Sequence, residues 1–367
     1  MKSRSNLKIL VVTGSTGGHI FPAVSFIESL KVKDPGVNVI LVIPKRSIKY
    51  VIPPEIPVRY ISITNINRGL TVSNFKSLFN FLKGGAESLI LVATFKPDVA
   101  VGFGSISSFW VIFWSWIFRI KVLIHEQNVL PGEASKLLSN FADKIAISFP
   151  ESRAYFKGRE DKVSLTGNPL RRSLRRIDKG EARGFFGLGR DKFTVLVCGG
   201  SQGSAHINHS FVEGLREIDR SRVQVIHLSG EKDFADLEAL YRGVNVEVKL
   251  FSFLENMEYA YSASDLAFTR AGAMTISELV FFNLPAVIIP YPYAKAHQSA
   301  NARVLQVRSC AIIINDRDFT GSEAARIIKE FQGYPGKIQG MRSGFKDLYK
   351  DNADYALAQE ALDLART

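Results

Sequence analysis

The feature that most constrains the fold of this chain is a series of short, uninterrupted apolar runs, each followed by a segment with helical periodicity. Continuous runs of Val, Ile and Leu are typical of strands covered on both faces, as in parallel sheets. Strands that alternate with helices predict an α/β, doubly wound fold. The runs are KILVVT, VNVILVIP, PDVAVGFG, KVLIHEQ, KIAISF and KVSLTG in the first half, and FTVLVCGG, VQVIHLSG, VEVKLFSF, DLAFTRAG, PAVIIPYP and CAIIIND in the second.

Both halves of the chain open with the same arrangement. VVTGSTGGHIFPAVSFIESL near the start is echoed by LVCGGSQGSAHINHSFVEGL, so the stretch at 25–30 corresponds to that at 210–215. A chain of 367 residues also exceeds the size at which one core keeps growing. We therefore expect two Rossmann-like domains facing a cleft, with substrate outside the carboxyl ends of the strands. The expected domains are 1–166 and 167–344, with a hinge in the charged stretch after Thr166.

Composition places the chain among ordinary globular proteins, since 46% of its residues are hydrophobic and 22% are charged. Cys198 and Cys310 both lie in apolar runs, which fits a reducing compartment and excludes a disulfide framework. The net charge of +12 suits nucleic acid, an anionic membrane surface or anionic substrates. The chain has no nucleic-acid reader motif, so nucleic acid is not an expected partner. The basic cluster NPLRRSLRRIDKGEARG is either a solvated linker or part of a substrate site.

Two segments raise the question of a membrane. The start, MKSRSNLKILVV, begins like a signal peptide, but its apolar run stops at Thr13 and no cleavage site follows. We expect no signal peptide and a protein that stays inside the cell. Residues 99–118 carry no charge before Arg119 and could be read as a transmembrane span. They divide more naturally into a strand at 99–103, a loop and a short apolar helix at 108–118.

Glycine-rich turns indicate where phosphates would bind. GSTGGH lacks the Lys-Ser/Thr of a P-loop and the spacing of the dinucleotide fingerprint, although Lys45 and Arg46 leave an NADP site as an alternative. In the second half, CGGSQGS and FTRAGAMTISEL each lead from a strand into a helix, so amides and the helix dipole can face an anion. The amides at 272–275 would hold a diphosphate, and Glu278 would accept the hydroxyls of a ribose. The segment HQSANA adds a third polar loop, with His297, Gln298 and Asn301.

One aspartate pair could be taken for a metal site. Asp316 and Asp318 stand in NDRDF, after a late strand and ahead of a helix. We interpret Asp318 as lying near a helix N-cap rather than as a metal ligand. We therefore expect neither a metal nor another cofactor.

In this order, GSTGGHIFPA, IHEQNVLPG, TGNPLR, GGSQGS, FLENM, RAGAMTISEL and HQSANA resemble the motifs of the lipid II-forming glycosyltransferases of glycosyltransferase family 28. The resemblance covers nearly the whole chain. It implies a GT-B fold, with sugar nucleotide held mainly by the second domain and a C-terminal helix within 345–367 that packs back on the first. It also implies inverting transfer of GlcNAc from UDP-GlcNAc to the 4-hydroxyl of MurNAc-(pentapeptide)-pyrophosphoryl-undecaprenol, which converts lipid I to lipid II in peptidoglycan synthesis.

The resemblance further implies roles for individual residues. Ser201 and Arg171 would meet the diphosphate region of UDP, and Leu254 would line the uracil pocket. Glu278 would bind the ribose. The residues that would wrap the phosphates are Gly272, Ala273, Met274, Thr275, Ile276 and Ser277. The junction of donor and acceptor would be formed by Thr16, Gly17, Gly18 and Asn128, and the GlcNAc would be contacted by His297 and Gln298.

Two positions depart from the family's pattern. GFGSISS, with Ser105 and Ile106, stands where the family has a glycine-rich loop with a tyrosine on the lipid-pyrophosphate side. Lys295 and Ala296 stand where the family has an acidic pair before HQ. Neither change removes a group that the chemistry requires.

A histidine in the first glycine turn suggests the catalytic base. A neutral imidazole titrates near physiological pH, so His19 could take the proton of the attacking hydroxyl. The alternative is that its ring only bonds the acceptor pyrophosphate or a local carbonyl. Glu126 and His125 in HEQN are alternative bases, and Asn128 follows them in the catalytic set.

Because the implied acceptor has a lipid tail, the enzyme must act at a membrane without spanning it. The predicted helix at 74–85 places Leu78 on one face with the residues of an expected membrane patch. That patch consists of Phe75, Lys76, Phe79, Leu82, Lys83, Trp110 and Trp114. Burial in a core is the competing interpretation of the aromatic residues. We expect a peripheral protein on the cytoplasmic face of the inner membrane, with the cell-wall synthesis machinery among its candidate partners.

Other functions remain as alternatives. A GT-B transferase could use a UDP-sugar on another lipid or a small-molecule acceptor. A non-catalytic sugar-nucleotide sensor would be favoured by the loss of His19, Glu278 or Gln298, and all three are present. An NADP oxidoreductase is the third alternative.

Overall fold

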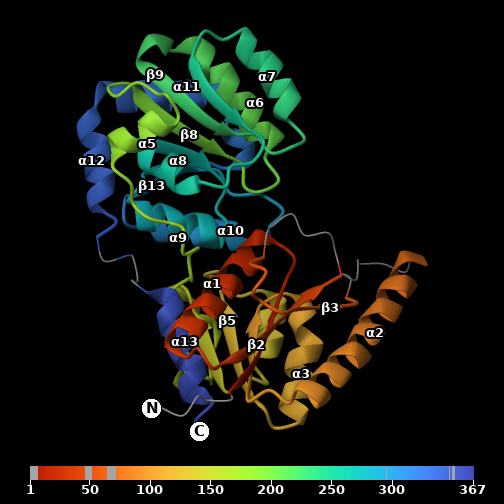
Figure 1. Cartoon of the computed structure of the whole chain (residues 1–367). Coiled ribbons are helices and arrows are strands. Elements are labelled where there is room, and N and C mark those ends of the chain that lie inside the picture. Colours follow the sequence, from red (N-terminus) through yellow and green to blue (C-terminus); the bar gives the residue numbers. More distant parts are fainter. Residues whose placement is uncertain (1–6, 46–51, 64–71, 295, 347, 349–351) are drawn as a thin grey trace. The chain divides into compact units, whose positions relative to one another are not determined.

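The computed structural model describes residues 7–45, 52–63, 72–294, 296–346, 348 and 352–367, and the side chains of 72–76 and 335 lie outside that description. The chain divides into two compact units. Unit 1 comprises Met1–Arg171 and Lys350–Thr367, and unit 2 comprises Arg172–Tyr349. Each is an α/β domain built on a parallel sheet (Figure 1).

The sheet of unit 1 has the strand order β3-β2-β1-β4-β5-β6-β7, and its strands pair in parallel. Because the order reverses beside β1, the ends of β1 and β4 form the topological switch point of this sheet. The strands are β1 (Lys8–Thr13), β2 (Asn38–Pro44), β3 (Val58–Ile61), β4 (Val99–Phe103), β5 (Lys121–Glu126), β6 (Lys144–Ile147) and β7 (Val163–Leu165).

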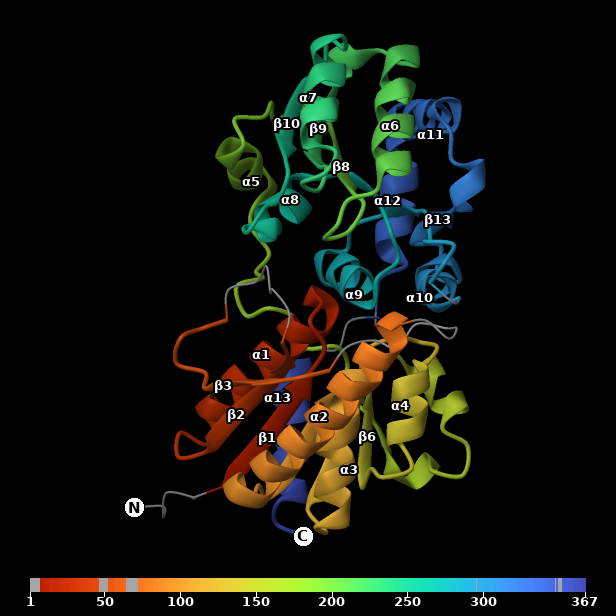
Figure 2. The same ribbon diagram turned by 90° about the vertical axis from the view of Figure 1, so that its right-hand side faces the viewer.

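Helices cover both faces of this sheet. Ile9 and Val11 of β1 belong to one core, and Leu10 belongs to the other, because alternate strand residues point to opposite faces. The first core is closed by α1 and α13, and the second by α2 and α3 (Figure 2). The helices are α1 (Gly17–Lys33), α2 (Val72–Phe95), α3 (Phe109–Ile117), α4 (Glu133–Leu138) and α13 (Ala353–Leu364), with 3-10 turns η1 (Ile106–Ser108), η2 (Pro150–Tyr155) and η3 (Glu160–Lys162).

The helix α13 comes from the last part of the chain but is part of unit 1. Leu357 and Ala361 are fully buried in the same core as Ile9. The hydroxyl of Ser29 on α1 donates to the carboxylate of Asp354, which fixes α13 along α1.

Unit 2 repeats the pattern with the strand order β10-β9-β8-β11-β12-β13, also in parallel pairs. Its switch point lies at the ends of β8 and β11. The strands are β8 (Phe193–Cys198), β9 (Val223–Leu228), β10 (Glu247–Phe251), β11 (Leu266–Thr269), β12 (Ala286–Ile288) and β13 (Ala311–Ile313).

One large core on the α6 and α11 side of this sheet contains Val195, Phe211, Phe268 and Ile327, all fully buried. The helices of unit 2 are α5 (Lys179–Phe185), α6 (Ala205–Gly214), α7 (Phe234–Arg242), α8 (Met257–Ala263), α9 (Ala273–Phe282), α10 (His297–Gln306), α11 (Gly321–Gly333) and α12 (Pro335–Ser343), with 3-10 turns η4 (Leu215–Glu217), η5 (Arg220–Arg222) and η6 (Asp316–Asp318).

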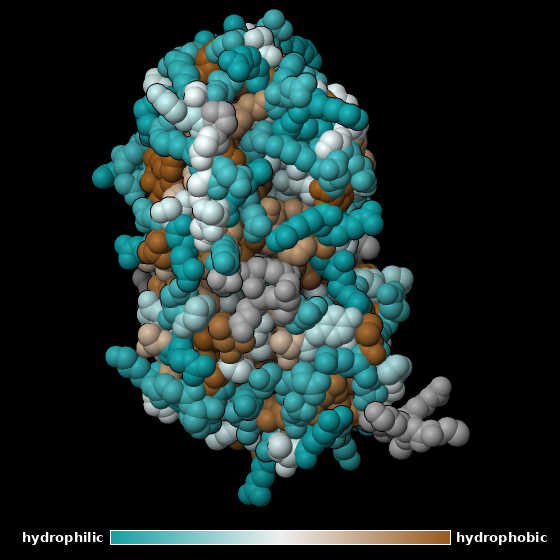
Figure 3. Space-filling view, turned by 90° about the vertical axis from the view of Figure 1, so that its left-hand side faces the viewer, coloured by the Kyte–Doolittle hydropathy of each residue, from teal (hydrophilic) through white to brown (hydrophobic). Residues whose placement is uncertain are grey.

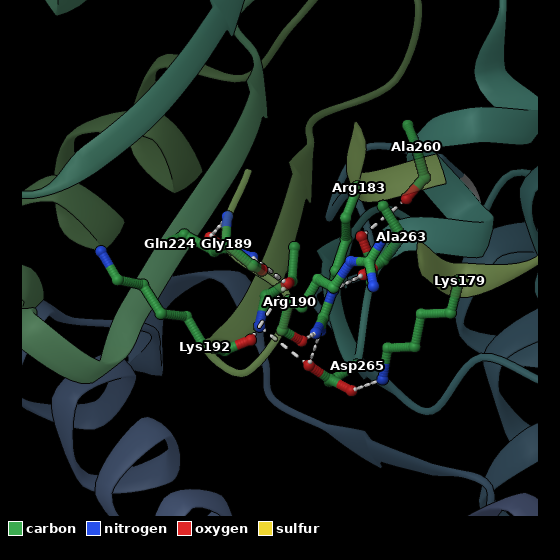
Figure 4. A network of polar contacts seen from close by, with 11 residues as sticks. Lys179, Arg183, Gly189, Arg190, Lys192, Gln224, Ala260, Ala263 and Asp265 are labelled. Carbon is green, nitrogen blue, oxygen red and sulfur yellow. Dashed lines mark hydrogen bonds and ion pairs between the residues drawn. The ribbon is translucent and has the colours of Figure 1, made fainter. Parts of the chain in front are cut away.

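A charged network attaches α5 to the sheet of unit 2 (Figure 4). The carboxylate of Asp265 accepts from Arg183 Nη2 at 2.8 Å, from the backbone amide of Thr194 at 2.8 Å and from Lys179 Nζ. Arg183 is buried, so the loss of Asp265 would leave an uncompensated charge, at a cost of about 3–5 kcal/mol. This network explains part of the basic cluster near 170–185 as structural.

Every strand expected from the apolar runs is confirmed, and so is the division of 99–118 into strand, turn and helix. One strand, β3, was not expected, because its sequence VRYI exposes Arg59 and Tyr60 and has no continuous apolar run. The helix expected at 74–85 continues through Gly84 to Phe95. A Cβ at Gly84 would overlap the carbonyl oxygen of Ser62, so these glycines permit close packing rather than end the helix.

Unit 1 extends to Arg171, beyond the expected boundary at Thr166. The hydroxyl of Ser25 on α1 donates to the carbonyl oxygen of Leu170 at 2.7 Å. The guanidinium of Arg171 lies 4.8 Å from the ring centre of Phe21. These contacts hold the segment after β7 against α1.

Candidate active site

The turn after β1 brings His19 to the switch point of unit 1. The carbonyl oxygen of Thr16 accepts from the amides of His19 and Ile20, both at 3.0 Å, which starts α1. A Cβ at Gly14 would lie 3.0 Å from both His19 Cδ2 and Ser105 Cβ, so the turns after β1 and β4 pack closely here. Thr16 and Gly18 are exposed beside this turn, and Gly17 is buried.

The environment of His19 favours its neutral form. Burial lowers the pKa of its imidazole from the ordinary 6.5, against the opposing effects of the Glu126 charge, the Gln127 amide and the Phe103 carbonyl, which raise it. Among the described residues, Nδ1 of His19 has no hydrogen-bond partner although it is buried. Nε2 is not left both buried and without a partner. The ring is therefore a neutral base at physiological pH with one nitrogen left for a ligand.

His125, an alternative base, is committed to structure. It is fully buried at the end of β5, and its Nε2 lies 3.0 Å from the Gly167 carbonyl oxygen. Its Nδ1 lies 3.1 Å from Gln127 Nε2. Burial lowers its pKa to about 4. Both ring nitrogens have protein partners, so this residue supports the site rather than receiving a substrate proton.

Glu126, the other alternative base, holds the loop after β5. Its Oε1 accepts from the backbone amide of Asn128 at 2.8 Å and from Asn128 Nδ2 at 3.1 Å, and its Oε2 accepts from the amide of Gly132 at 3.2 Å. The buried carboxylate is thus engaged on both oxygens. Its negative charge raises the pKa of His19, so it acts on the imidazole from a distance.

In unit 2, three turns follow adjacent strands and begin helices. The first joins β8 to α6 and contains the exposed Ser201. Gly203, with φ of +75°, fits so closely against the carbonyl of Ser229 that any Cβ would overlap it. The second turn joins β11 to α9, and Gly272 is the N-cap of that helix. Backbone amides at the starts of α6 and α9 therefore gather near the switch point, where an anion is favoured.

The start of α9 contains the other residues expected at the phosphates. Ala273, Met274 and Ile276 are buried, and Thr275 is half-buried. Ser277 Oγ donates to the Ala273 carbonyl oxygen at 3.0 Å. The buried side chains pack, so only the backbone and the hydroxyl groups of this turn can serve a ligand.

Glu278 is held in place by a tyrosine. Its Oε2 accepts from the hydroxyl of Tyr261 at 2.7 Å, and the side chain is buried. Burial raises the pKa of Cys198 to about 11, and the charge of Glu278 contributes to that increase. The carboxylate therefore lies near the end of β8, at the switch point.

Gln298 connects the third turn to the second. Its Oε1 accepts from the amides of Ala271 at 3.1 Å and Tyr291 at 2.9 Å. Its side-chain oxygen is thus committed to the backbone, and its NH2 group is the part that can reach a sugar. His297 is half-buried at the start of α10, and Leu254 is half-buried in the turn between β10 and α8.

Arg270 and Asp316 form an ion pair behind these turns. Arg270 Nη1 lies 2.5 Å from Asp316 Oδ1, and its Nη2 donates to Ser204 Oγ at 2.7 Å. Asp316 thus has a structural partner. Asp318 accepts from Asn315 Nδ2 at 2.8 Å, while Thr320 caps α11. Within the described residues no cluster of three or more His, Cys, Asp or Glu side chains could hold a metal ion.

The expected membrane patch is partly exposed. Phe79 and Leu82 on α2 are 67% and 57% exposed, and Lys83 is exposed beside them. Trp110 and Trp114 are half-buried, and Trp114 Nε1 donates to the Gly85 carbonyl oxygen at 2.9 Å, so they attach α3 to α2. The side chains of Phe75 and Lys76 lie outside the described residues.

Further apolar side chains extend the exposed surface of α2 and α3: Leu78, Ile90, Trp116, Ile117 and Phe118. Among the described residues one helical stretch, Ser77–Phe95, is long and apolar enough to cross a membrane, and 22% of it is buried. The face opposite that of Figure 2 shows apolar residues in small groups among hydrophilic ones (Figure 3).

Three residues of the site had no role in the sequence interpretation. Gln127 stood inside the quoted HEQN, and its place two residues after His125 was the available signal. Arg270 stood inside RAGAMTISEL, but its pairing with Asp316 spans a long sequence separation. Tyr261 comes from a different helix, and no local pattern indicated its contact with Glu278.

Comparison with known proteins agrees with this geometry. Residues 9–147 match the glycosyltransferase family 28 N-terminal domain, and residues 194–352 match the C-terminal domain. The UDP-N-acetylglucosamine–N-acetylmuramyl-(pentapeptide) pyrophosphoryl-undecaprenol N-acetylglucosamine transferase of Desulforamulus reducens is 33% identical, over 95% of this chain and 96% of that protein. The Bacillus subtilis protein of the same name is 35% identical, over 86% and 88%.

Solved structures agree at the level of the fold. The crystal structure of Acinetobacter baumannii MurG superposes with a TM-score of 0.75 at 22% identity, covering 97% of this chain and 99% of that one. UDP-GlcNAc 2-epimerase of Neisseria meningitidis, bound to UDP-GlcNAc, gives 0.66 at 13% identity, covering 98% and 99%. The fold is therefore GT-B, and the chain belongs to glycosyltransferase family 28.

Proposed function

We propose that this protein transfers GlcNAc from UDP-GlcNAc to the 4-hydroxyl of MurNAc in undecaprenyl-pyrophosphoryl-MurNAc-pentapeptide, forming lipid II for peptidoglycan. The observation that carries the proposal is the neutral, partly open His19 at the switch point of a chain whose relatives bear that transferase name. The enzyme class is a UDP-GlcNAc-dependent glycosyltransferase.

Unit 2 is the proposed donor-binding domain. The amides at the starts of α6 and α9, with Ser201, would face the diphosphate, since helix N-termini favour anions. Arg171 of unit 1 would add a fixed positive charge. Glu278, oriented by Tyr261, would accept hydrogen bonds from the ribose, and Leu254 would pack on the uracil. The NH2 group of Gln298, with His297, would contact the GlcNAc.

Unit 1 is the proposed acceptor domain. The 4-hydroxyl oxygen of MurNAc attacks C1 of GlcNAc while the bond from C1 to the UDP oxygen breaks, which inverts the anomeric centre. The hydroxyl proton passes to His19, and the bonding pair leaves with the diphosphate. Amides aimed at that growing charge stabilise it without solvent reorganisation. Asn128 and the turn at 16–18 would position the two sugars.

The membrane association is proposed to be peripheral, on the cytoplasmic face. The exposed Phe79 and Leu82 would enter the interface, and Lys83 would contact anionic headgroups, at about 1 kcal/mol for each cation near the surface. Flotation of Phe79→Asp/Lys83→Glu with anionic liposomes tests this. Undiminished flotation would overturn the patch, and Val307→Asp, at an exposed apolar site in unit 2, is the matched control.

The activity test uses radiolabelled lipid I and a set of sugar nucleotides. We expect a labelled lipid II product with UDP-GlcNAc and little product with UDP-glucose. Transfer to diacylglycerol or to a small aglycone instead of lipid I would identify a GT-B enzyme with another acceptor. Nucleotide binding without transfer to any of these acceptors would identify a sensor.

A further inference from the structure

A chain of three polar side chains connects the core of unit 1 to the candidate base. His125 is the last residue but one of β5, Gln127 follows that strand, and His19 lies in the first turn of α1. His125 and Gln127 are buried, and the Nδ1 atom of His19 is buried too. The hydrogen-bond donors and acceptors of this network follow from the contact that His125 makes at its buried end.

The inner end fixes the tautomer of His125. Its Nε2 lies 3.0 Å from the carbonyl oxygen of Gly167, which can only accept a hydrogen bond. Nε2 therefore carries the proton. Because burial lowers the pKa of this ring to about 4, the ring is neutral and Nδ1 is an acceptor.

His125 in turn fixes the orientation of the Gln127 amide. Its Nε2 lies 3.1 Å from His125 Nδ1 and 3.2 Å from the carbonyl oxygen of His125. Both of those atoms are acceptors, so the nitrogen and not the oxygen of the amide must occupy this position. The Oε1 atom then points the other way, where it is buried without a partner among the described residues.

The Oε1 atom of Gln127 lies near the imidazole of His19. A Cβ built on Gly104 would lie 3.4 Å from Gln127 Oε1 and 3.6 Å from His19 Nδ1, so both atoms border the same glycine. Two buried polar atoms without partners are costly unless they complement each other. An amide oxygen accepts only, so complementarity requires a proton on Nδ1.

We propose that Gln127 is a positioning residue that holds His19 as the Nδ1–H tautomer, so that the Nε2 lone pair faces the acceptor hydroxyl. The proposal rests on the proposed role of His19 as base. A neutral imidazole without such a partner divides between two tautomers, and only the one with a bare Nε2 can take the proton there.

Two titratable groups belong to the surroundings of the His19 ring. The Glu126 carboxylate raises the pKa of His19 and so favours the imidazolium, whereas His125 is neutral and its own pKa is lowered by the charge of a protonated His19. Neither accepts from Nδ1. The Phe103 carbonyl also favours a proton on the ring, in the same direction as the Gln127 oxygen. The amide of Gln127 is the member of this set whose replacement leaves the backbone intact.

The test is nitrogen NMR of the full chain with 15N-labelled histidine. The chain has six histidines, and His19→Asn identifies the His19 signals by their loss. We expect the wild-type ring to show a protonated Nδ1 and an unprotonated Nε2. Gln127→Met, which keeps the length but removes both polar atoms, should shift the ring toward the Nε2–H form, and Gln359→Met on α13 should leave it unchanged.

Kinetics give the second measurement. Gln127→Met should lower kcat about 10-fold or more, by analogy with other general-base defects, with little change in the KM for UDP-GlcNAc. Gln127→Glu keeps an acceptor toward Nδ1 and adds charge, so it should retain more turnover than Met and move the acid limb of the kcat profile to higher pH. The pH shift of Gln127→Glu, measured against the wild type, tests the proposal even if the Met variant does not fold.

A wild-type His19 in the Nε2–H form, or an unchanged His19 tautomer in a folded Gln127→Met protein, would overturn the proposal. Equal losses in Gln127→Met and Gln127→Glu would assign Gln127 a packing role instead. Because the NMR needs no substrate, it separates this proposal from the base mechanism. If His19→Ala keeps full turnover, the mechanism fails even where the tautomer is as expected.

Discussion

The sheets of the two units share the order of their first six strands, but the turns after β1 and β8 carry different residues. Counted back from the echoed Ser25 and Ser210, His19 in unit 1 corresponds to Ser204 in unit 2. His19 has an ionisable ring with one open nitrogen, whereas the hydroxyl of Ser204 accepts from the buried Arg270 at 2.7 Å. The shared scaffold thus holds the proposed proton acceptor in one unit and a turn of backbone amides in the other.

Removal of the base should give the largest effect. His19→Ala is expected to lower kcat about 10²–10⁴-fold, the usual contribution of general acid–base catalysis, with donor binding nearly unchanged. Turnover with lipid I and calorimetric titration of UDP-GlcNAc measure the two quantities separately.

The pH profile checks the same residue. Since burial lowers the pKa of His19 below 6.5, the acid limb of the wild-type kcat profile should lie below that value. Equal losses in turnover and donor affinity in His19→Ala would make this residue a binding group, and the contrast between the two turns would disappear.

The donor side should respond in affinity instead. Glu278→Ala removes hydrogen bonds to a charged group, worth about 1.5–3 kcal/mol, so the KM for UDP-GlcNAc should rise about 10–100-fold. Tyr261→Phe removes only the bond that orients Glu278 and should give a smaller increase. A fall in kcat at unchanged KM would contradict the assignment of unit 2 to the donor.

Acid should weaken unit 2 through a buried histidine. His227 bonds Tyr241 and Asn208, and burial lowers its pKa to about 3. The unfolded chain therefore takes up the proton first, so this stability is complete above about 6.5 and is lost as pH falls toward 3. Between pH 6.5 and 5 the loss is about 2 kcal/mol.

Hydrogen exchange of β8 and β9 against pH measures this loss. In His227→Gln the dependence on pH should be shallower, whatever the change in absolute stability. Strand β5 of unit 1, which contains the buried His125, serves as an internal comparison. An unchanged slope in the variant would show that another group controls the acid sensitivity of unit 2.

Strain at the turn after β4 should give the smallest effect. Ser105 has φ of 66° and ψ of 150°, a region that suits glycine, and such conformations cost about 1–3 kcal/mol. Ser105→Gly and Ser105→Ala both lose the hydroxyl that accepts from the Ser107 amide, but only the glycine variant loses the strain. Ser105→Gly should therefore have a free energy of unfolding about 1 kcal/mol above that of Ser105→Ala, after the entropy of the unfolded glycine is subtracted. Equal free energies of unfolding for the two variants, measured in urea, would show that the backbone at Ser105 is not strained.

Local sequence was sufficient for most of the fold because buried parallel strands are continuous apolar runs. It failed at β3, whose exposed Arg59 and Tyr60 interrupt the run at a sheet edge. The helix predicted from the sequence at 74–85 was also shorter than α2. Gly84 looked like a helix end, because its close packing on Ser62 depends on tertiary structure and cannot be read from the local sequence.

The site was predictable to the extent that one loop carries it. The turns with His19 and with Gly272 could be found because strand, glycine and helix are consecutive in sequence. The partners that tune them could not, since Tyr261 and Gln127 reach Glu278 and His19 from other elements. Motifs identify reacting groups, while the orientation of those groups depends on contacts between distant segments.

The placement of α13 has a consequence for how the chain matures on the ribosome. Leu357 and Ala361 complete the packing around Ile9, yet they are translated after all of unit 2. The earliest-made domain must therefore keep an apolar surface uncovered until α13 has been synthesised, so its core closes only after unit 2 has been made.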